Sequence, residues 1–481
     1  MKLPGFLKEK EEKKEWNRIA SRGGSYSLTL TALVLAILVV INVLVSALPS
    51  SWTKFDISSA KLYSITSNTK VVVNALEKDV TIYWITQSGE EDAVIENLLS
   101  KYESLSDHIE VVKKNPDIYP TFASQYTSET VSNNSLVVES GEKSRFIAYE
   151  DIYLSELDYT TYSYSYSFDG EGALTSAIDY VVREELPILY VLEGHGEQEL
   201  PEGFAAQIKK ENIETKTFSL LTEKEVPKEA DGVLIYGPTS DISTEEKELL
   251  ENYVNNGGKM MVCAGPTESG TLTNLYSLLE AYGVEAQDGI VVESDQDHYA
   301  FGYPYILLPE ITDTEINNPL LDGGYYAIVP IAQGLKVGDS EAVTELLTTS
   351  ETAFAKKAGY DLNTYEKEEG DSDGPFALAV SIDCGKEGQI LWFGTSYLLD
   401  ETYDSYSSGA NMDLAMSAIA SMLGENEAIA INSKSLSYNY LTISDSTASF
   451  LKIVMIGVCP VVYLGVGIGV ILKRRKMNEA C

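Results

Sequence analysis

The sequence predicts an α/β protein that is anchored in a membrane at both ends. Two observations carry this prediction. Buried apolar strands alternate with amphipathic helices through the middle of the chain, and one long uncharged apolar segment lies near each terminus. Between these segments we expect a thioredoxin-like domain followed by a doubly wound, flavodoxin- or amidotransferase-like α/β domain. The composition agrees with a folded protein, because 44% of the 481 residues are hydrophobic and 22% are charged.

Each apolar terminal segment is long enough to cross a bilayer. Residues 28–48 and residues 453–472 contain no charged side chain. About 20 apolar residues in a helix span a hydrocarbon core of about 30 Å, so we expect transmembrane helices over residues 27–48 and 450–472. A cleavable signal peptide is the alternative for the first segment, with Val45-Ser46-Ala47 as its cleavage site. The apolar run is longer than in a usual signal peptide, which favours the anchor.

The charge distribution predicts an orientation. The whole chain has 35 Lys and Arg against 73 Asp and Glu, a formal charge of −38, yet both ends are basic. Because Lys and Arg accumulate on the cytoplasmic side, we expect a cytoplasmic N-terminus (residues 1–26) and a cytoplasmic tail (residues 473–481). Residues 49–449 would then lie outside the plasma membrane, with the lipid bilayer as a partner. The acidic composition excludes nucleic acid as a partner, since phosphate binding needs a basic surface.

The first predicted domain covers residues 49–185. Its order of strand, helix, strand, hairpin and helix is that of a thioredoxin-like domain. The chain contains no CxxC motif, so redox chemistry is not expected to accompany this order. The expected elements are a short helix at Thr69–Leu76, strands at Val80–Thr86, Ile109–Val112, Ser135–Glu139 and Arg145–Tyr149, and helices at Glu91–Ser104 and Glu171–Val182.

The second predicted domain covers residues 186–430 and is followed by a linker over residues 431–449. Continuous apolar strands, typical of a parallel sheet buried on both faces, alternate with helices. An acidic, Gly-rich stretch at about 295–370 is expected to be an irregular insertion. The expected strands are Ile188–Leu192, Gly232–Tyr236, Lys259–Cys263, Phe376–Ile382 and Gln389–Gly394, and the expected helices lie around Phe204–Lys210, Ser243–Val254 and Leu414–Met422.

The turn formed by Gly194, His195, Gly196 and Glu197 is the strongest candidate for a ligand crevice. It follows an expected parallel strand, where open α/β sheets place their ligands. The glycines permit close backbone approach, and the next helix would favour an anion. His195 and Glu197 are too few to define a metal site, so we predict neither a metal nor another cofactor. The alternative is a hydrogen-bonded turn with a structural histidine.

Cys263 follows a strand in the way that the nucleophile of an amidotransferase-type domain does. A cysteine nucleophile needs a histidine partner, and the chain has only His108, His195 and His298. We expect a buried thiol and no catalytic residue, while a disulfide between Cys263 and Cys384 stays open.

Tyr162, Tyr164 and Tyr166 alternate with serines at a period of two. This spacing places the three rings on one face of an extended segment. The face is a candidate aromatic contact surface for a sugar or a protein partner, and packing within its own domain is the alternative. The chain also lacks the GxxxxGK[ST] motif, so we do not expect it to hydrolyse ATP by itself.

The assembled motifs resemble the gliding-motility-type auxiliary component of ABC transporters. The most specific motifs are Asp169-Gly170-Glu171, Thr175-Ser176-Ala177-Ile178 and Gly194-His195-Gly196-Glu197, and the similarity extends over nearly the whole chain. The resemblance implies a non-enzymatic membrane subunit that works beside a separate ATPase and permease. It also implies an amidotransferase-related α/β region without a working catalytic set.

Two alternatives to this accessory role stay open. One is a membrane-tethered protein that binds the cell envelope through its tyrosine face. The other is a hydrolase that uses the crevice at His195 and Glu197. The auxiliary transport subunit is our main prediction, with its large central domains binding substrate or partner.

Overall fold

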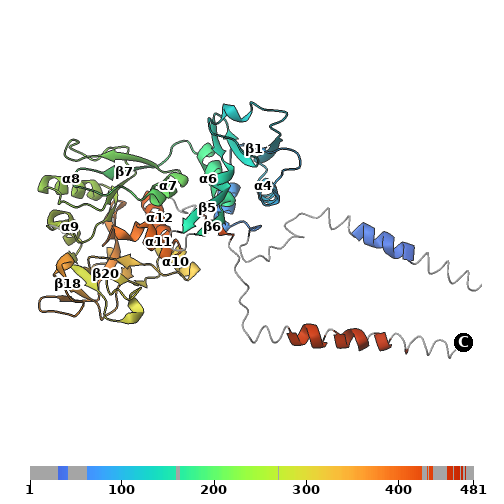
Figure 1. Cartoon of the computed structure of the whole chain (residues 1–481). Coiled ribbons are helices and arrows are strands. Elements are labelled where there is room, and N and C mark those ends of the chain that lie inside the picture. Colours follow the sequence, from blue (N-terminus) through green and yellow to red (C-terminus); the bar gives the residue numbers. More distant parts are fainter. Residues whose placement is uncertain are drawn as a thin grey trace, which may run out of the picture. The chain divides into compact units, whose positions relative to one another are not determined.

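The fold was analysed in a computed structural model. It describes residues 31–41, 62–158, 163–268, 270–424, 431, 433–436, 452–458, 460–465, 467–469 and 472. Its contacts divide the chain into a large unit, Ile65–Tyr438, and a terminal unit made of Met1–Ser64 with Asn439–Cys481. Figure 1 shows the elements of the large unit, which hold all the strands of the described residues.

The predicted membrane anchoring is wrong. In the described part of the chain, no helix is both long enough and apolar enough to cross a bilayer. The first predicted span contributes a helix over residues 31–41, which at 1.5 Å per residue rises about 16 Å, and a hydrocarbon core needs about 30 Å. In the second, Ile453–Val458 forms a π-helix. Residues 460–465 and 467–469 of the second segment are also helical, while the other residues of the first segment, both basic termini and the Val45-Ser46-Ala47 site lie outside the described residues.

This finding also overturns the localisation. The placement of residues 49–449 outside a plasma membrane depended on two helices that span the bilayer. Since the described residues provide neither of them, the orientation that we derived from the basic ends no longer follows.

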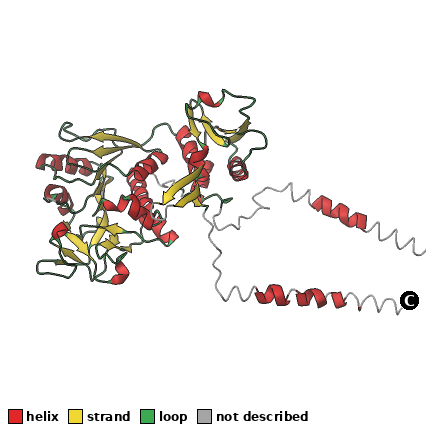
Figure 2. Ribbon diagram, viewed as in Figure 1, coloured by secondary structure: helices red, strands yellow, loops and turns green. Residues whose placement is uncertain are grey.

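The α/β class is confirmed (Figure 2), and the first region has the expected order of elements along the chain. In the described residues its four strands are ordered β2-β1-β3-β4, with β1 and β2 parallel and β3 antiparallel to its neighbours. Helix α4 begins at Asp92, whose carboxylate accepts hydrogen bonds from the N–H groups of Val94 and Ile95. The elements are α3 (Ser67–Asn74), β1 (Val80–Ile85), α4 (Ala93–Leu105), β2 (Ile109–Lys114), η1 (Ala123–Gln125), β3 (Ser135–Ser140), β4 (Lys143–Ile147), α5 (Tyr149–Ile152) and α6 (Gly170–Val182).

A small antiparallel sheet lies beside this region. It contains β5 (Tyr153–Asp158), β6 (Ser163–Phe168) and β22 (Lys434–Ser435), in the order β22-β6-β5. The pairing of Lys434 with Phe168 joins the C-terminal end of the large unit to the segment that precedes α6. The sequence pattern did not predict this sheet.

The second region contains a mixed sheet that has ten strands within the described residues. Five parallel strands, β8-β7-β9-β10-β21, form its centre. Of these five strands, β7 comes first along the chain and lies between β8 and β9, so the strand order reverses between β7 and β9. This reversal is the topological switch point at which open α/β sheets bind ligands.

The two faces of this sheet are covered by different helices, as expected for a doubly wound fold. Phe204 of α7 and Leu414 of α12 belong to one apolar cluster, while Leu250 of α8 and Leu275 of α9 belong to the other. Side chains of the central strands alternate between the clusters, because successive residues of a strand point to opposite faces. The elements before the insertion are β7 (Ile188–Leu192), α7 (Glu202–Lys210), β8 (Glu214–Phe218), β9 (Gly232–Tyr236), α8 (Thr244–Asn255), β10 (Lys259–Cys263), α9 (Thr273–Glu280), β11 (Val284–Ala286) and β12 (Ile290–Val292).

The stretch that we expected to be irregular contains short strands. These strands pair with one another and with β20. The side chain of Lys356, at the end of one of them, is fully buried. Lys356 contacts the carboxylates of Glu368 and Asp371, which compensates for burying its charge. The elements are η2 (Gln296–His298), β13 (Ile306–Leu307), β14 (Glu310–Ile311), η3 (Glu315–Asn317), α10 (Asn318–Gly323), β15 (Val329–Pro330), β16 (Leu335–Val337), β17 (Val343–Thr348), β18 (Phe354–Lys356), η4 (Gly359–Asp361), β19 (Ser372–Asp373), β20 (Ala377–Gly385), β21 (Gly388–Phe393), η5 (Tyr397–Leu399), α11 (Glu401–Tyr406) and α12 (Ala410–Leu423).

Candidate functional site

The candidate turn lies at the carboxyl edge of the parallel strands. Gly194–Glu197 follows β7, and three other loops reach the same edge at Gly237 after β9, Gly265 after β10 and Ser396 after β21. These loops border two cavities, described below, on the side of the sheet where the switch point predicts a crevice. The structure therefore brings the four predicted residues to the expected edge.

His195 is held between two carboxylates. Its side chain is 5% exposed; Nδ1 lies 3.1 Å from Oε1 of Glu197, and Nε2 lies 3.2 Å from both carboxylate oxygens of Glu246. The hydrogen bond to Glu197 raises the pKa of His195; burial opposes this rise, and the charge of Glu246 adds to it. Both ring nitrogens of the resulting imidazolium can donate to a carboxylate.

The same group joins three loops. Oε2 of Glu197 accepts hydrogen bonds from the N–H groups of Gly194 and His195, at 2.9 and 2.7 Å. Glu246 belongs to the capping box that starts α8, where Ser243 donates to its carboxylate and caps its N–H in return. The carbonyl of His195 accepts from the N–H groups of Thr239 and Ser240, at 3.1 and 2.8 Å. His195 thus fastens the β7 turn to α8 and to the loop after β9.

Glycine is required at position 196. Its φ angle is +72°, and a Cβ atom there would lie 2.2 Å from Oγ1 of Thr239. The turn can therefore pack on the loop after β9 only without a side chain at this position.

Two cavities open along the edge. One of about 470 Å³ lies between the Gly194–Glu197 turn and Thr215 and Thr217 of β8. The other, of about 250 Å³, is lined by Gly237, Gly265, Ser396 and by Ile331 and Tyr360 of the insertion. We call this second cavity the edge crevice. Its described lining residues include no Lys, Arg or His, so it offers no cation to an anionic ligand.

Cys263 is fully buried in β10. Burial raises the pKa of its thiol to about 12, so the reactive thiolate is scarce at neutral pH. Cys263 and Cys384 are both free thiols, which leaves no disulfide between them. Within the described residues, no group of three or more His, Cys, Asp or Glu side chains is arranged to hold a metal ion.

Part of the predicted tyrosine face is observed. Tyr164 and Tyr166 lie on β6, are 60% and 55% exposed, and have ring centroids 6.5 Å apart. Tyr162 lies outside the described residues. The two described rings share one face, as the alternation predicts.

Sequence reasoning missed the role of Glu171. This buried side chain accepts hydrogen bonds through Oε1 from the Thr66 N–H at 2.6 Å and from the Thr69 hydroxyl at 2.8 Å. Its Oε2 lies 2.8 Å from Nζ of Lys434. Burial opposes ionisation of Glu171, but the bonds from Lys434 and Thr66 outweigh it and lower the pKa. We call this group the Glu171 clasp. Its sequence signal was the motif Asp169-Gly170-Glu171, which we used only as a mark of resemblance.

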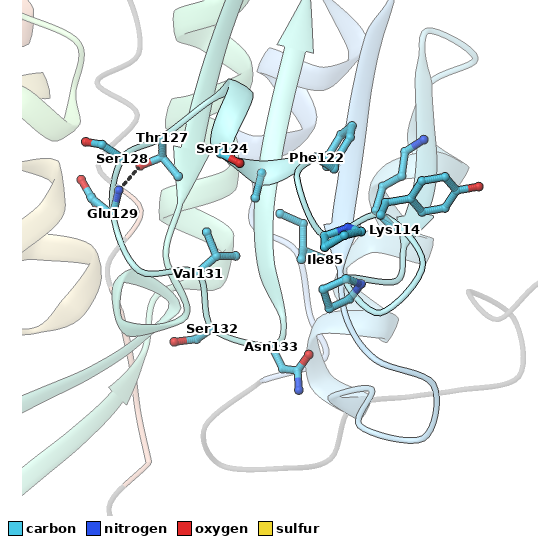
Figure 3. A pocket seen from close by; sticks show the side chains of 14 residues that line it. Ile85, Lys114, Phe122, Ser124, Thr127, Ser128, Glu129, Val131, Ser132 and Asn133 are labelled. Carbon is cyan, nitrogen blue, oxygen red and sulfur yellow. Dashed lines mark hydrogen bonds between the residues drawn. The ribbon is translucent and has the colours of Figure 1, made fainter.

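A further pocket of about 340 Å³ lies at the carboxyl ends of β1 and β2, between Ile85, Val131 and the loop that leads to β3 (Figure 3). Lys114 is the basic residue among its described lining residues. The ammonium group lies 5.1–5.3 Å from the ring centroids of Tyr83, Tyr119 and Phe122. Lys114 therefore already has cation–π partners.

Comparison with known proteins gives one informative family. Residues 186–383 match the model of the ABC-type uncharacterized transport system. This match supports an auxiliary component of an ABC transporter, which is the coarser part of our prediction. Residues 59–155 match a second family, described as a domain of unknown function (DUF7088). No protein with a curated description matches the chain.

Similarity to solved structures is weak. The mmIFT52 N-terminal domain is 16% identical, with a TM-score of 0.37 over 49% of this chain and 97% of its own. A glutamine amidotransferase from Thermotoga maritima is 9% identical, with a TM-score of 0.30 over 50% of this chain and 99% of its own. The exo-beta-1,4-mannosidase Op5Man5 from Opitutaceae bacterium strain TAV5 is 10% identical, with a TM-score of 0.29 over 69% of this chain and 49% of its own. At these scores we infer nothing from them.

Proposed function

We propose that the chain is a non-catalytic accessory component of an ABC-type transport system, in which a separate ATPase and a separate permease are its partners. The observation that carries the proposal is the match of residues 186–383 to the ABC-type transport family. The gliding-motility type is the finer form of the proposal, and it rests on the motifs that include Gly194-His195-Gly196-Glu197.

The chemistry of the carboxyl edge supports a non-catalytic role. Cys263, at the position of a nucleophile, is buried and has a raised thiol pKa. His195, the histidine at this edge, already has a carboxylate at each ring nitrogen. A general base must be free to take a proton from a nucleophile or from water, and a charged imidazolium between two carboxylates is not.

A binding role fits the same edge. The edge crevice and the larger cavity beside β8 offer concave surfaces, and the crevice is formed by loops from several strands. We propose that these loops contact a substrate or partner of the transport system and do not transform it.

The test is an affinity purification of the tagged full-length protein from its native cells, with the co-purifying proteins identified by mass spectrometry. We expect a nucleotide-binding ATPase and a permease to be recovered in comparable amounts. A tagged unrelated acidic protein is the control, because a charge of −38 binds basic proteins unspecifically. Recovery of neither component above this control would overturn the proposal.

A further inference from the structure

Exposed aromatic side chains of the insertion and of α11 lie close to one another. The rings of Phe301 and Tyr406 have centroids 4.7 Å apart, and Tyr305 lies 5.7 Å from Tyr303 and 5.8 Å from Tyr365. Phe301, Tyr303, Tyr365 and Tyr406 are between 43% and 56% exposed. Single exposed apolar residues are normal on a protein, but a contiguous group of large rings is typical of an interaction site. We call these five residues, together with Tyr403, the tyrosine surface.

The backbone at Phe301 is unusual. Its φ angle of +58° lies in the left-handed region, which bulky side chains rarely adopt. The strain holds an exposed ring against Tyr406 where burial gives little in return. Strained residues of this kind concentrate at functional sites.

The tyrosine surface continues toward the edge crevice. Tyr403 and Tyr406 lie in α11, which packs against η5, the short helix that contains Tyr397. Tyr397 lines the edge crevice together with Tyr360. The aromatic groups therefore extend from the insertion to the carboxyl edge of the parallel sheet.

The charge around these rings has one sign. Most of the rings come from two segments, residues 260–335 and 387–433, that contain no Lys or Arg and hold 11 and 7 acidic residues. Tyr365 lies outside these segments, and Lys367, two residues after it, is paired with Asp373. The two segments therefore present ring faces and carboxylates, and no Lys or Arg of their own, to a cation that approaches the tyrosine surface.

We propose that the tyrosine surface binds an Arg- and Lys-bearing segment of a partner protein. The face of an aromatic ring attracts a guanidinium or ammonium group, and the surrounding carboxylates add long-range attraction. Arg is favoured because its planar group stacks on rings. An anionic partner is excluded by the same acidic surroundings.

The inference deepens the proposed function, since it names the kind of partner segment that an accessory subunit recognises. It does not depend on which protein carries that segment. A direct binding measurement tests the basic-segment inference alone. If that inference fails, the recovery of an ATPase and a permease still tests the proposed function.

The experiment measures fluorescence anisotropy of a labelled 12-residue peptide of alternating Arg and Ser, titrated with the full-length protein at about 0.15 M salt. The test variant carries Tyr303→Leu and Tyr406→Leu, which keep apolar bulk and remove the ring faces. The matched control carries Tyr63→Leu and Tyr119→Leu, which remove two exposed rings that do not belong to the tyrosine surface. Circular dichroism checks that both variants are folded. If the double test variant does not fold, the single variant Tyr303→Leu replaces it.

We expect the test variant to bind the Arg peptide about 5- to 30-fold more weakly, from two exposed cation–π contacts. The single variant should bind about 2- to 5-fold more weakly. The control with Tyr63→Leu and Tyr119→Leu should bind like the wild type, and a peptide of alternating Glu and Ser should not bind. Equal affinity in wild type and test variant, or an equal loss in the control, would overturn the inference and leave only general attraction by an acidic chain.

Discussion

At the scale of single residues, the structure assigns His195 a structural role. Sequence reasoning located the turn and its position after β7, and it kept the hydrogen-bonded turn as an alternative. It did not find the contact of His195 with Glu246, which lies 51 positions away along the chain. That contact is created by the packing of α8 beside the turn, and no local pattern reports such packing. The same reason hid Lys434, which lies 263 positions from Glu171.

The first prediction concerns the pH dependence of the His195 group. The raised pKa of His195 contributes stability below its ordinary value of 6.5, and this contribution is lost as pH rises through the folded value. The lowered pKa values of Glu197 and Glu246 contribute stability above 4.5, which is lost as pH falls through their folded values. The group is therefore most stabilising between about pH 4.5 and 6.5.

We expect His195→Gln to lower the free energy of unfolding by about 2 kcal/mol at pH 5.5, and by clearly less at pH 9. Urea denaturation at both pH values measures the difference. His108→Gln is the control, because His108 is exposed beside Asp79. A gap between wild type and His195→Gln that grows toward pH 9 would contradict the assignment.

The second prediction concerns the Glu171 clasp. Glu171→Gln leaves the half-buried ammonium of Lys434 without its carboxylate, so we expect a loss of about 3 kcal/mol in the free energy of unfolding. Adding Lys434→Met should recover part of that loss, since it removes the buried charge that has lost the carboxylate of Glu171. Thermal and urea unfolding measure both variants. Glu251→Gln breaks the surface pair with Lys247 and should change stability by less than about 0.5 kcal/mol.

At the scale of elements, strands and helices with a clear apolar pattern could be predicted, whereas polar strands such as β8 and very short strands could not. The five apolar strands of the second region and its helices through Phe204, Leu250 and Leu414 are observed where the periodicity placed them. Alternation needs about four residues to be recognised, and the strands at Ile306–Leu307 and Val329–Pro330 have two. Such strands form because their neighbours are already in place.

The third prediction tests the turn between β7 and α7. Gly196→Ala adds a methyl group at a positive φ angle and into the hydroxyl of Thr239, so we expect a loss of more than about 2 kcal/mol. Gly385→Ala is a matched control: its φ angle of +74° is similar, but no atom lies within 4 Å of the added carbon. It should lose only about 1 kcal/mol. Equal losses would show that backbone strain alone acts at Gly196.

At the scale of the whole molecule, the α/β class predicted from the sequence was correct, but the two predicted membrane spans were wrong. A hydropathy pattern reports composition over a window. It does not by itself establish a membrane-spanning helix, and within the described residues no helix is long and apolar enough to cross a bilayer.

The fourth prediction follows from the net charge. With 73 acidic and 35 basic side chains, the folded chain repels itself, and salt screens this repulsion over about 10 Å at 0.1 M. We therefore expect the unfolding temperature to rise by several degrees between 10 and 300 mM NaCl. Differential scanning calorimetry measures the shift, and an equal concentration of uncharged osmolyte distinguishes screening from general solute effects. A fall in unfolding temperature with NaCl would contradict the expectation.

The Glu171 clasp also has a mechanical consequence. Thr66 and Lys434 stand near the two ends of the large unit, and both bond to one carboxylate. A pull applied between Thr66 and Lys434 would load these polar contacts and the β22–β6 pairing first, before the four-stranded and ten-stranded sheets. The two ends of the large unit are therefore held together through Glu171. A force between them reaches the rest of the fold only after these contacts break.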